Sequence, residues 1–347
     1  MLQREIYDER YLGTGYDERS SVRVLTAEAS ALRCAVQRAV ESLPDSTALS
    51  LLDFGYGTGR VTNTFAAEYP VELGAIRRDL RVVAYDVSSV GLRKATTELV
   101  KRHGFDVTHP LDFHPGATEG YIAGSVSRLT EGCTVTVTFV HGTERADPDE
   151  VRTLVEKAND GQPFALTTSW YSALAHIPTA ARRAAYFQML DAVTDSRGEL
   201  LIAPSVSGDL VQLQAEWTNR LRAGDVGEYP IEQPGDVIYE TEIGQKNFYH
   251  VFGADLAGLL DSIGGPGRYT WMEAIRMPDP EFDSKAAELD NYRRVREFNE
   301  RLGRQRWQAE EYLQVHTALA VRSGNPHGGA GALAGSATMG PPAGAGE

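Results

Sequence analysis

The sequence predicts an α/β fold in which a mostly parallel sheet is covered by helices on both faces. Short apolar runs typical of buried strands alternate with segments of helical period, and five such strands occur between residues 48 and 205. Polar or glycine-containing turns separate the segments. Because consecutive parallel strands need a crossover, which is usually a helix, this strict alternation favours a parallel sheet.

The first elements follow from apolar spacing and from residues that end helices. Leucines and valines recur at helical spacing over residues 25–43, and Pro44 ends that helix. The apolar run "ALSLLDF" predicts a strand at 48–54, which a glycine turn and a helix at 61–68 follow. The run "LRVVAYD" predicts a strand at 80–86. The helix after it, 88–103, has Ser88 or Ser89 as its N-cap and Gly104 beyond its end.

The alternation of predicted strands and helices continues to residue 205 and then becomes irregular. The predicted strands are 133–142, 163–170 and 197–205, and the helices between them are 147–160 and 179–193. Later elements are a helix at 253–265, a strand at 269–277, a charged helical stretch at 284–311 and a strand at 312–322. We therefore expect an N-terminal helical cap at 1–46, one domain at 47–322 with inserts at about 105–129 and 278–311, and a disordered Gly/Ala/Pro-rich tail at 323–347.

Charge and composition exclude several classes of function. The chain has 48 acidic and 34 basic side chains, so its formal charge of −14 repels phosphate backbones and a nucleic-acid partner is not expected. Its two cysteines, Cys34 and Cys133, lack metal-ligand spacing, so we expect buried thiols in a reducing compartment and no metal site. No run approaches the length of a membrane span and the first residues do not resemble a signal peptide, which predicts a cytoplasmic protein without a membrane partner.

The turn after the first strand, "LLDFGYGTGRVT", places glycines at every second position, Gly55, Gly57 and Gly59. A glycine-rich first turn in an α/β sheet lets the backbone approach a ligand at the carboxyl ends of the strands. A dinucleotide site requires the spacing G-x-G-x-x-G, and the position of its third glycine is Arg60 here. The spacing therefore disfavours a nicotinamide cofactor.

The stretch "DFGYGTG" resembles the first motif of the class I S-adenosylmethionine (SAM)-dependent methyltransferases, an acidic residue followed by x-G-x-G-x-G. This resemblance implies a Rossmann-like three-layer sandwich, with a seven-stranded, mostly parallel sheet whose last strand is antiparallel. It also implies SAM as co-substrate. In the family an acid that binds the ribose hydroxyls ends the second strand, and Asp86 in "VVAYDVSS" matches it. A carboxylate is a suitable acceptor for two neighbouring hydroxyls.

Two later segments resemble the family more loosely. "FVHGTER" looks like the loop beside the adenine, and the segment from the fourth to the fifth strand includes a His-Ile-Pro that is familiar from the family. The resemblance implies that the glycine turn wraps the methionine part of SAM and that Asp53 organises the turn or reaches the amino group. The cofactor-binding residues implied in this way are Asp53, Gly55, Tyr56, Gly57, Gly59, Asp86, Val87, Gly142, Thr143 and Ser169.

A methyltransferase that acts on a protonated nucleophile needs a base. The candidate catalytic residues are His176, His250 and Tyr171, and each of them could equally be a packing residue. His141 ends the third strand and is expected near the cofactor. Glu242 and His250 lie in "YETEIGQKNFYHVF", which could form a substrate wall or ordinary surface.

The acceptor is expected to be a small molecule. Family members that methylate amide or adenine nitrogens carry Asn or Asp, Pro, Pro and an aromatic residue after the fourth strand, whereas this chain has Ser169, Trp170 and Tyr171. The sequence therefore predicts methyl transfer to an oxygen or nitrogen of a natural-product or amino-acid-like acceptor. Tyr7, Tyr11 and Tyr16 of the twice-occurring "YDER" segments could fold over the cofactor, and the stretch 278–311 could be a lid or the face of a homodimer.

Two alternatives remain open at this point. One is an NAD(P)-dependent oxidoreductase on a related fold, which shares the sheet and the acid after the second strand but needs the other glycine spacing. The other is a non-catalytic SAM-fold binding partner, which keeps the glycine turn and needs no acceptor pocket.

Overall fold

A computed structural model describes residues 3–13, 22–43, 48–69, 78–130, 132–170, 173–205, 231–240, 244–253, 255–264, 269–275 and 317–322. The predicted helix at 284–311 and the predicted tail at 323–347 lie outside these ranges, as do Tyr16, Tyr171 and Glu242. Among the described residues, no helix combines the length and the apolar character that a membrane span requires.

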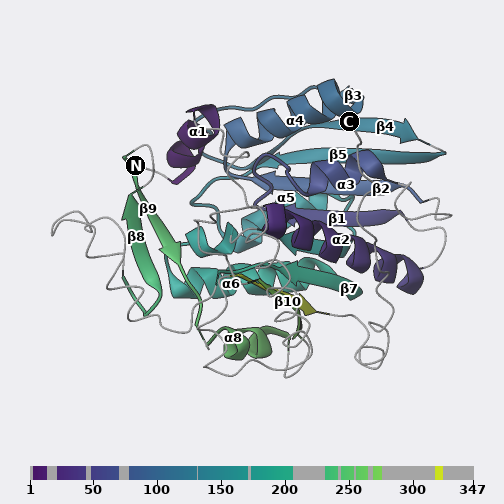
Figure 1. Cartoon of the computed structure of the whole chain (residues 1–347). Coiled ribbons are helices and arrows are strands. Elements are labelled where there is room, and N and C mark those ends of the chain that lie inside the picture. Colours follow the sequence, from purple (N-terminus) through teal and green to yellow (C-terminus); the bar gives the residue numbers. More distant parts are fainter. Residues whose placement is uncertain are drawn as a thin grey trace, which may run out of the picture.

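The fold is α/β, and the described residues form a mixed sheet of nine strands in the order β10-β11-β7-β6-β1-β2-β5-β4-β3 (Figure 1). The central strands β5, β2, β1, β6 and β7 pair in parallel. The bounds are β1 Leu49–Phe54, β2 Leu80–Asp86, β3 Asp106–His109, β4 Tyr121–Thr130, β5 Cys133–His141, β6 Phe164–Ser169, β7 Thr194–Ile202, β10 Tyr269–Ile275 and β11 Thr317–Arg322.

The sheet differs from the expectation of seven strands with antiparallel pairing confined to the last strand. At one edge β11 pairs antiparallel with both β7 and β10. At the other edge β4 pairs antiparallel with β5 and with β3, within the segment expected to be an irregular insert. All four residues of β3 are exposed, and a register shift beside Gly124 interrupts β4. Strand β3 therefore lacks the buried run from which the sequence predicts a strand, and in β4 the buried residues are confined to 123–126.

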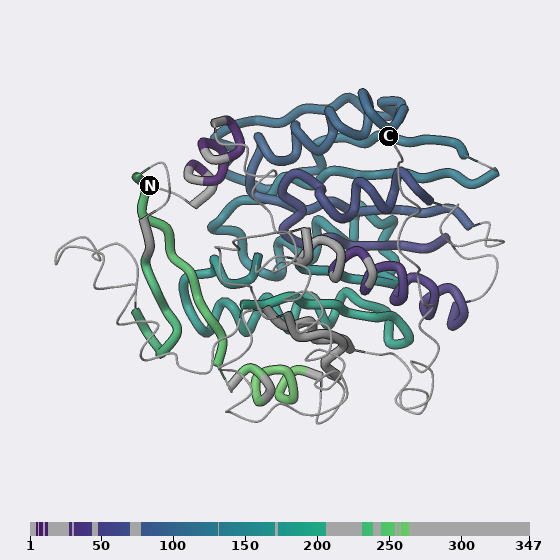
Figure 2. Tube along the Cα trace, in the orientation of Figure 1, coloured from purple at the N-terminus to yellow at the C-terminus, as the bar shows by residue number. Residues whose placement is uncertain are grey.

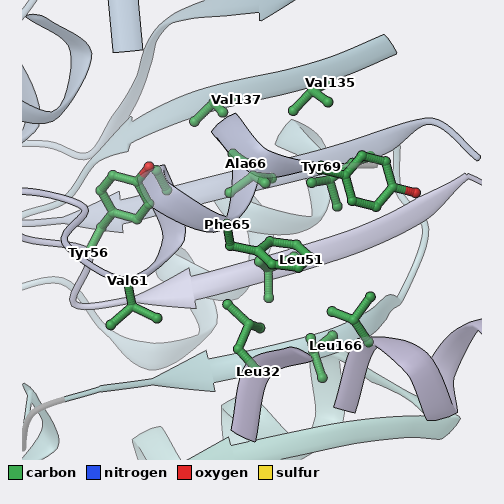
Figure 3. Packing of buried hydrophobic residues seen from close by; sticks show 14 of the residues in the cluster. Leu32, Leu51, Tyr56, Val61, Phe65, Ala66, Tyr69, Val135, Val137 and Leu166 are labelled. Carbon is green, nitrogen blue, oxygen red and sulfur yellow. The ribbon is translucent and has the colours of Figure 1, made fainter. Parts of the chain in front are cut away.

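Two hydrophobic clusters cover the two faces of the sheet. Residues of β1 alternate between them, because successive side chains of a strand point to opposite faces: Leu51 belongs to one cluster and Leu52 to the other. Figure 3 shows the first cluster, in which Leu32 and Phe65 pack on Leu51 and Leu166. Helices α2 Val22–Ser42, α3 Thr62–Glu68 and α4 Ser89–His103 cover this face, and α5 Pro148–Ala158, α6 Ala180–Val193 and α8 Asp255–Gly264 cover the other.

Helix caps lie where short polar residues precede the helices. The hydroxyl of Ser88 caps α4 by accepting from the backbone N–H of Gly91 over 2.9 Å, and Gly104 ends the helix with a φ of +68°. Helix α5 begins with a capping box of Asp147 and Glu150, with Pro148 in its first turn. These caps fix where the loops at the carboxyl ends of the strands enter the helices.

The chain reverses direction across the sheet beside β1. It runs from β1 through β2 to β5 on one side, and then crosses to β6 and β7 on the other side. The loops after β1 and β6 therefore diverge at the carboxyl edge, which is where open α/β sheets bind ligands.

Two further elements lie at the edge where the parallel strands end. Helix α1, Gln3–Gly13, contacts α4, and a hairpin of β8 Asp236–Glu240 and β9 Lys246–His250 contacts both α1 and the short helix η2, Ala173–His176. Figures 1 and 2 show α1 and this hairpin at the same end of the molecule. The amide of Gln245 joins them by donating to Glu9 over 2.7 Å. Helix α1 and the β8–β9 hairpin together cover the carboxyl ends of the parallel strands.

Candidate functional site

The turn after β1 requires glycine for two independent reasons. Gly55, Gly57 and Gly59 have φ values of +83°, +54° and +74°, which side-chain-bearing residues rarely adopt. A Cβ on Gly55 would lie 2.3 Å from Cβ of Ala173, and a Cβ on Gly57 would lie 2.8 Å from Oη of Tyr11. The turn thus packs closely against η2 on one side and against α1 on the other.

Asp86 ties the end of β2 to this turn. Its Oδ2 accepts from the backbone N–H of Gly57 over 2.7 Å, and its Oδ1 accepts from that of Ser88 over 2.7 Å. The backbone N–H of Val87 also bonds to this carboxylate, and because a carboxylate offers about four lone-pair sites, acceptor capacity is left for a ligand hydroxyl group. Burial raises the pKa of Asp86 to about 6, although its bonds to backbone N–H groups oppose the rise.

Asp53 lies beneath the turn rather than at its surface. The hydroxyls of Thr62 and Thr168 donate to its two oxygens over 2.5 and 3.2 Å, and only 2% of Asp53 is exposed. Burial raises the pKa of Asp53 to about 7, while the two hydroxyl hydrogen bonds oppose the rise. Its contacts join β1, β6 and α3, which suits the role of organising the turn.

The loop after β5 runs beside Asp86. The backbone N–H of Gly142 donates to the carbonyl oxygen of Asp86 over 2.8 Å, and a Cβ on Gly142 would lie 2.2 Å from Oη of Tyr85. His141 is fully buried, and its Nε2 donates to the carbonyl oxygen of Val87 over 3.1 Å. The structure thus brings Val87 and Gly142 together with Asp86, and Thr143 follows directly in the chain.

Three buried polar side-chain atoms near the carboxyl ends of β2 and β6 have no hydrogen-bond partner among the residues that the structure describes. They are Oγ of Ser89, Oγ of Ser169 and Nε1 of Trp170. Ser169 ends β6 at the point where the chain crosses the sheet, and Trp170 follows it, while Ser89 lies three residues after Asp86. Leaving a buried donor or acceptor unpaired costs about 1–3 kcal/mol, so these atoms indicate that the site is completed by a ligand with polar groups.

Helix α1 closes over the glycine turn and the start of α4. The ring of Tyr11 lies against Gly57 and Gly91, since Cβ atoms built on those glycines would lie 2.8 Å and 3.0 Å from it. Asp8 accepts from the hydroxyl of Ser88 over 2.6 Å, and Lys94 donates to the carbonyl oxygen of Tyr11. Tyr11 therefore lies at the turn as the sequence suggested, and Asp8 is an additional residue there that the sequence analysis missed.

Of the two candidate bases that the structure describes, His176 is partly exposed and His250 is buried. Nε2 of His176 lies 2.5 Å from Oη of Tyr7, and its Nδ1 lies 3.1 Å from the carbonyl oxygen of Phe248 in β9. The rings of Tyr7 and Tyr249 stand edge-on to it, with centroids 5.2 and 4.9 Å away. The hydroxyl of Tyr249 is in turn hydrogen-bonded to Ser205, beyond the end of β7. This aromatic row of Tyr11, Tyr7, His176 and Tyr249 spans the edge from Gly57 to β7.

His250 has a different environment. It is 1% exposed, and its Nδ1 lies 2.7 Å from Oδ1 of Asp236, which also accepts from Arg183 over 3.1 Å. Burial alone would raise the pKa of Asp236, but the bond to His250, the backbone N–H groups and the charge of Arg183 together lower it. This buried cluster holds the β8–β9 hairpin against α6.

Comparisons with known proteins give structural likeness only. No family model and no curated protein matches the chain. Among solved structures, the chain is similar to a 1,6-didemethyltoxoflavin-N1-methyltransferase from Burkholderia thailandensis with bound S-adenosylhomocysteine, with 13% identity, 92% of this chain and 85% of that chain covered, and a TM-score of 0.42. It is also similar to a SAM-bound amino pentose methyltransferase from Micromonospora echinaspora, with 15% identity, 92% and 97% covered, and a TM-score of 0.39. A third is magnesium protoporphyrin IX methyltransferase from Synechocystis, with 12% identity, 92% and 100% covered, and a TM-score of 0.40. At this level of similarity, the chemistry of the site has to be judged from its own residues.

Proposed function

We propose that this chain is a SAM-dependent methyltransferase that acts on a small molecule. The observation that carries the proposal is the bond from Gly57 to Asp86, which makes the glycine turn and the acid after β2 one unit beside the crossover between β1 and β6. The spare acceptor capacity of Asp86 suits a ribose, and the backbone of the turn is suited to the close approach of a ligand.

The residues at the carboxyl ends of β1, β2, β5 and β6 are suited to hold SAM. Asp86 would hold the ribose hydroxyls, and Val87, Gly142 and Thr143 would lie beside the adenine. The turn from Gly55 to Gly59 would lie along the methionine part, with Tyr56 inside the turn and Asp53 beneath it. Oγ of Ser169 and Nε1 of Trp170 would form hydrogen bonds with the same ligand. When bound, SAM supplies a methyl group on a positively charged sulfur.

A nicotinamide dinucleotide fits this edge less well. The position that needs a third glycine is occupied by Arg60, whose Nη2 lies 3.9 Å from Oε2 of Glu28 in α2. In dinucleotide sites that glycine permits close packing of the first helix on the sheet. A non-catalytic SAM-fold protein is also less well supported, since it has no use for the aromatic row at the far end of the edge.

The acceptor is proposed to be a small molecule because of what surrounds the edge. Helix α1 and the β8–β9 hairpin are joined over it by Gln245 and Glu9. The formal charge of −14 disfavours a polyanionic substrate. We propose that α1 acts as a cap, whereas α2 packs on the sheet, and that the nucleophile is an oxygen or a nitrogen.

Differential scanning fluorimetry with SAM, S-adenosylhomocysteine (SAH), NADH and NADPH tests the proposal. We expect SAM and SAH alone to raise the Tm, since a ligand at about 100 times its Kd stabilises a protein by about 2.7 kcal/mol. Asp86→Ala should lose the response. Asp112→Ala, which removes an exposed carboxylate paired with His114 on the edge hairpin, should keep it. Stabilisation by a nicotinamide, or an unchanged SAH response in Asp86→Ala, would refute the proposal.

A further inference from the structure

We propose that Tyr7 of helix α1 is a catalytic residue that takes the proton from an aromatic hydroxyl on the acceptor, and that His176 stores this proton behind it. This inference rests on the proposed function and narrows its acceptor to phenol-like molecules. It follows from the direction of two hydrogen bonds and from the rings that surround them.

The direction of the bonds at His176 is fixed by chemistry. The carbonyl oxygen of Phe248 can only accept, so Nδ1 of His176 must carry a hydrogen. In a neutral imidazole the other nitrogen, Nε2, then has a lone pair and accepts. The phenol of Tyr7, 2.5 Å away, is therefore the donor in this bond. When His176 is neutral, the proton of Tyr7 therefore points at the unprotonated nitrogen of the imidazole.

This arrangement gives a proton a defined route. A phenol oxygen that donates its hydrogen can still accept one. A proton that leaves the acceptor hydroxyl binds to Oη of Tyr7, while the hydrogen of Tyr7 moves to Nε2 of His176. The acceptor becomes an anion, Tyr7 stays neutral, and His176 becomes an imidazolium that later gives its proton to water. Charge and protons balance without any further reactant.

The position of the pair matches the proposed methyl-transfer site. Tyr7 stacks beside Tyr11 with ring centroids 5.7 Å apart, and Tyr11 lies on Gly57. His176 ends the helix whose Ala173 packs on Gly55. Tyr7, His176 and Tyr249 are each partly exposed, whereas His141 and His250 are buried. Tyr7 is four residues from Tyr11, and His176 is three residues from Ala173. Each member of the pair therefore lies about one helical turn from a residue that contacts the glycine turn.

The chemistry of the surroundings selects the acceptor. The aromatic row presents several rings, which favour stacking or edge contacts with a planar aromatic molecule. A base is most useful to a nucleophile that keeps its proton at neutral pH, as a phenol does. An aromatic amine reacts through the lone pair it already has, so it needs no base before attack.

The probe 4-nitrophenol tests the pair because its anion is coloured. In protein loaded with SAH, we expect the wild type to bind it and to lower its apparent pKa, which is seen as added phenolate absorbance. Tyr7→Phe should return the apparent pKa of the probe to its free value and weaken phenolate binding about tenfold or more, as expected for the loss of a hydrogen bond to a charged group. His176→Gln should do the same, because Gln can keep both hydrogen bonds but cannot store a proton.

A matched control separates this role from general effects of losing a tyrosine hydroxyl. Tyr69→Phe removes a buried hydroxyl that donates to the carbonyl oxygen of Arg78 over 2.7 Å, in a segment that leads into the amino end of β2. It should leave the response of the probe unchanged. A wild type that neither binds 4-nitrophenol nor ionises it, retention of the response in Tyr7→Phe or His176→Gln, or equal binding of 4-nitroaniline would overturn the inference.

Calorimetry with SAH distinguishes failure of this inference from failure of the proposed function. If SAH binds the wild type and Tyr7→Phe alike while the probe results fail, only the role of Tyr7 is wrong. If SAH does not bind the wild type, the proposed function itself is wrong, and the inference falls with it.

Discussion

The backbone N–H of Gly57 donates to Oδ2 of Asp86 over 2.7 Å, so the turn after β1 is joined directly to the acid that ends β2. The second oxygen of the same carboxylate accepts from Ser88 at the start of α4, and the hydroxyl of Ser88 reaches Asp8 of α1. A single carboxylate thus connects the ligand edge of the sheet to the helix that covers it. Substitutions in either the turn or α1 should therefore change the affinity of the site for its ligand.

Substitution of Gly57 should separate backbone strain from steric conflict. Gly57→Ala places a methyl group 2.8 Å from Oη of Tyr11 at a φ of +54°, so we expect lost SAH binding as well as a stability loss. Gly104→Ala is the matched control, because its φ is +68° and nothing lies within 4 Å of the added carbon. Both should cost about 1–2 kcal/mol in urea unfolding, and only Gly57→Ala should lose SAH in calorimetry. Equal SAH binding by the two variants would contradict the packing of Tyr11 on the turn.

The buried hydroxyl of Ser169 should lower the stability of the ligand-free protein and strengthen the binding of SAH. Ser169→Ala should raise the free energy of unfolding by about 1 kcal/mol and weaken SAH binding, because it removes a buried group whose partner is the ligand. Ser50→Ala is the matched control. Its hydroxyl accepts from the backbone N–H of Ala165 over 3.0 Å, so its loss should destabilise the protein and leave SAH binding unchanged. Thermal unfolding measures the stability of both variants, and calorimetry measures their binding of SAH.

Binding of SAH should depend on pH through Asp86. The pKa of this carboxyl is raised by burial to about 6, so it gains a proton, and loses acceptor capacity, as the pH falls below 6. We expect the Kd of SAH to increase about tenfold between pH 7 and pH 5 and to level off above pH 7. Asp86→Asn should bind weakly with little pH dependence. A wild-type Kd that is constant from pH 5 to pH 8 would show that Asp86 does not hold the ligand.

Stability should depend on pH through Asp53, with a sign opposite to that of an ion-paired acid. Its pKa is about 7 in the folded chain against an ordinary 3.8, so the folded state binds the proton more tightly than the unfolded state. The contribution of Asp53 to stability is therefore fully present below pH 4 and is lost as the pH rises towards 7, by on the order of 4 kcal/mol. Asp53→Asn should remove this fall. Unfolding curves of both proteins at pH 4 and pH 7.5 measure it, and equal pH slopes would contradict the buried position of Asp53.

The buried cluster of Arg183, Asp236 and His250 should be structural. Asp236→Ala leaves Arg183 without its buried carboxylate partner, which typically costs 3–5 kcal/mol, so we expect a large drop in Tm. Asp195→Ala, which removes a more exposed carboxylate paired with Arg197, should change stability by about 1 kcal/mol or less. A Tm of Asp236→Ala close to that of the wild type would mean that the cluster does not anchor the hairpin.

The parts of the fold that the sequence predicts are those with local signals. The strand ending in Asp53 and Phe54 is a buried run, and Ser88 and Gly104 cap α4 as their residue types indicate. The hairpin of β3 and β4 has no such signal, since its outer strand, β3, is exposed on every residue and forms by pairing with β4, which in turn pairs with β5. A strand of this kind depends on pairing rather than on its own residues.

The site could be predicted only where its residues are neighbours in a motif. The glycine turn follows from its spacing and Asp86 from the resemblance to the methyltransferase motif, but the bond between Tyr7 and His176 joins residues 169 positions apart. The same limit applies to His250, which a polar and aromatic stretch suggested as a base. The structure shows it paired with Asp236 and buried, because a histidine beside a strand can face either a ligand or an ion pair, and the sequence does not show which.

A crystal structure of the protein with SAH tests the central claim most directly. The account predicts the ribose hydroxyls within hydrogen-bond distance of Asp86, the methionine part along Gly55 to Gly59, and new partners for Ser169 and Trp170. SAH bound elsewhere, or a ligand at this edge that leaves the carboxylate of Asp86 untouched, would contradict it.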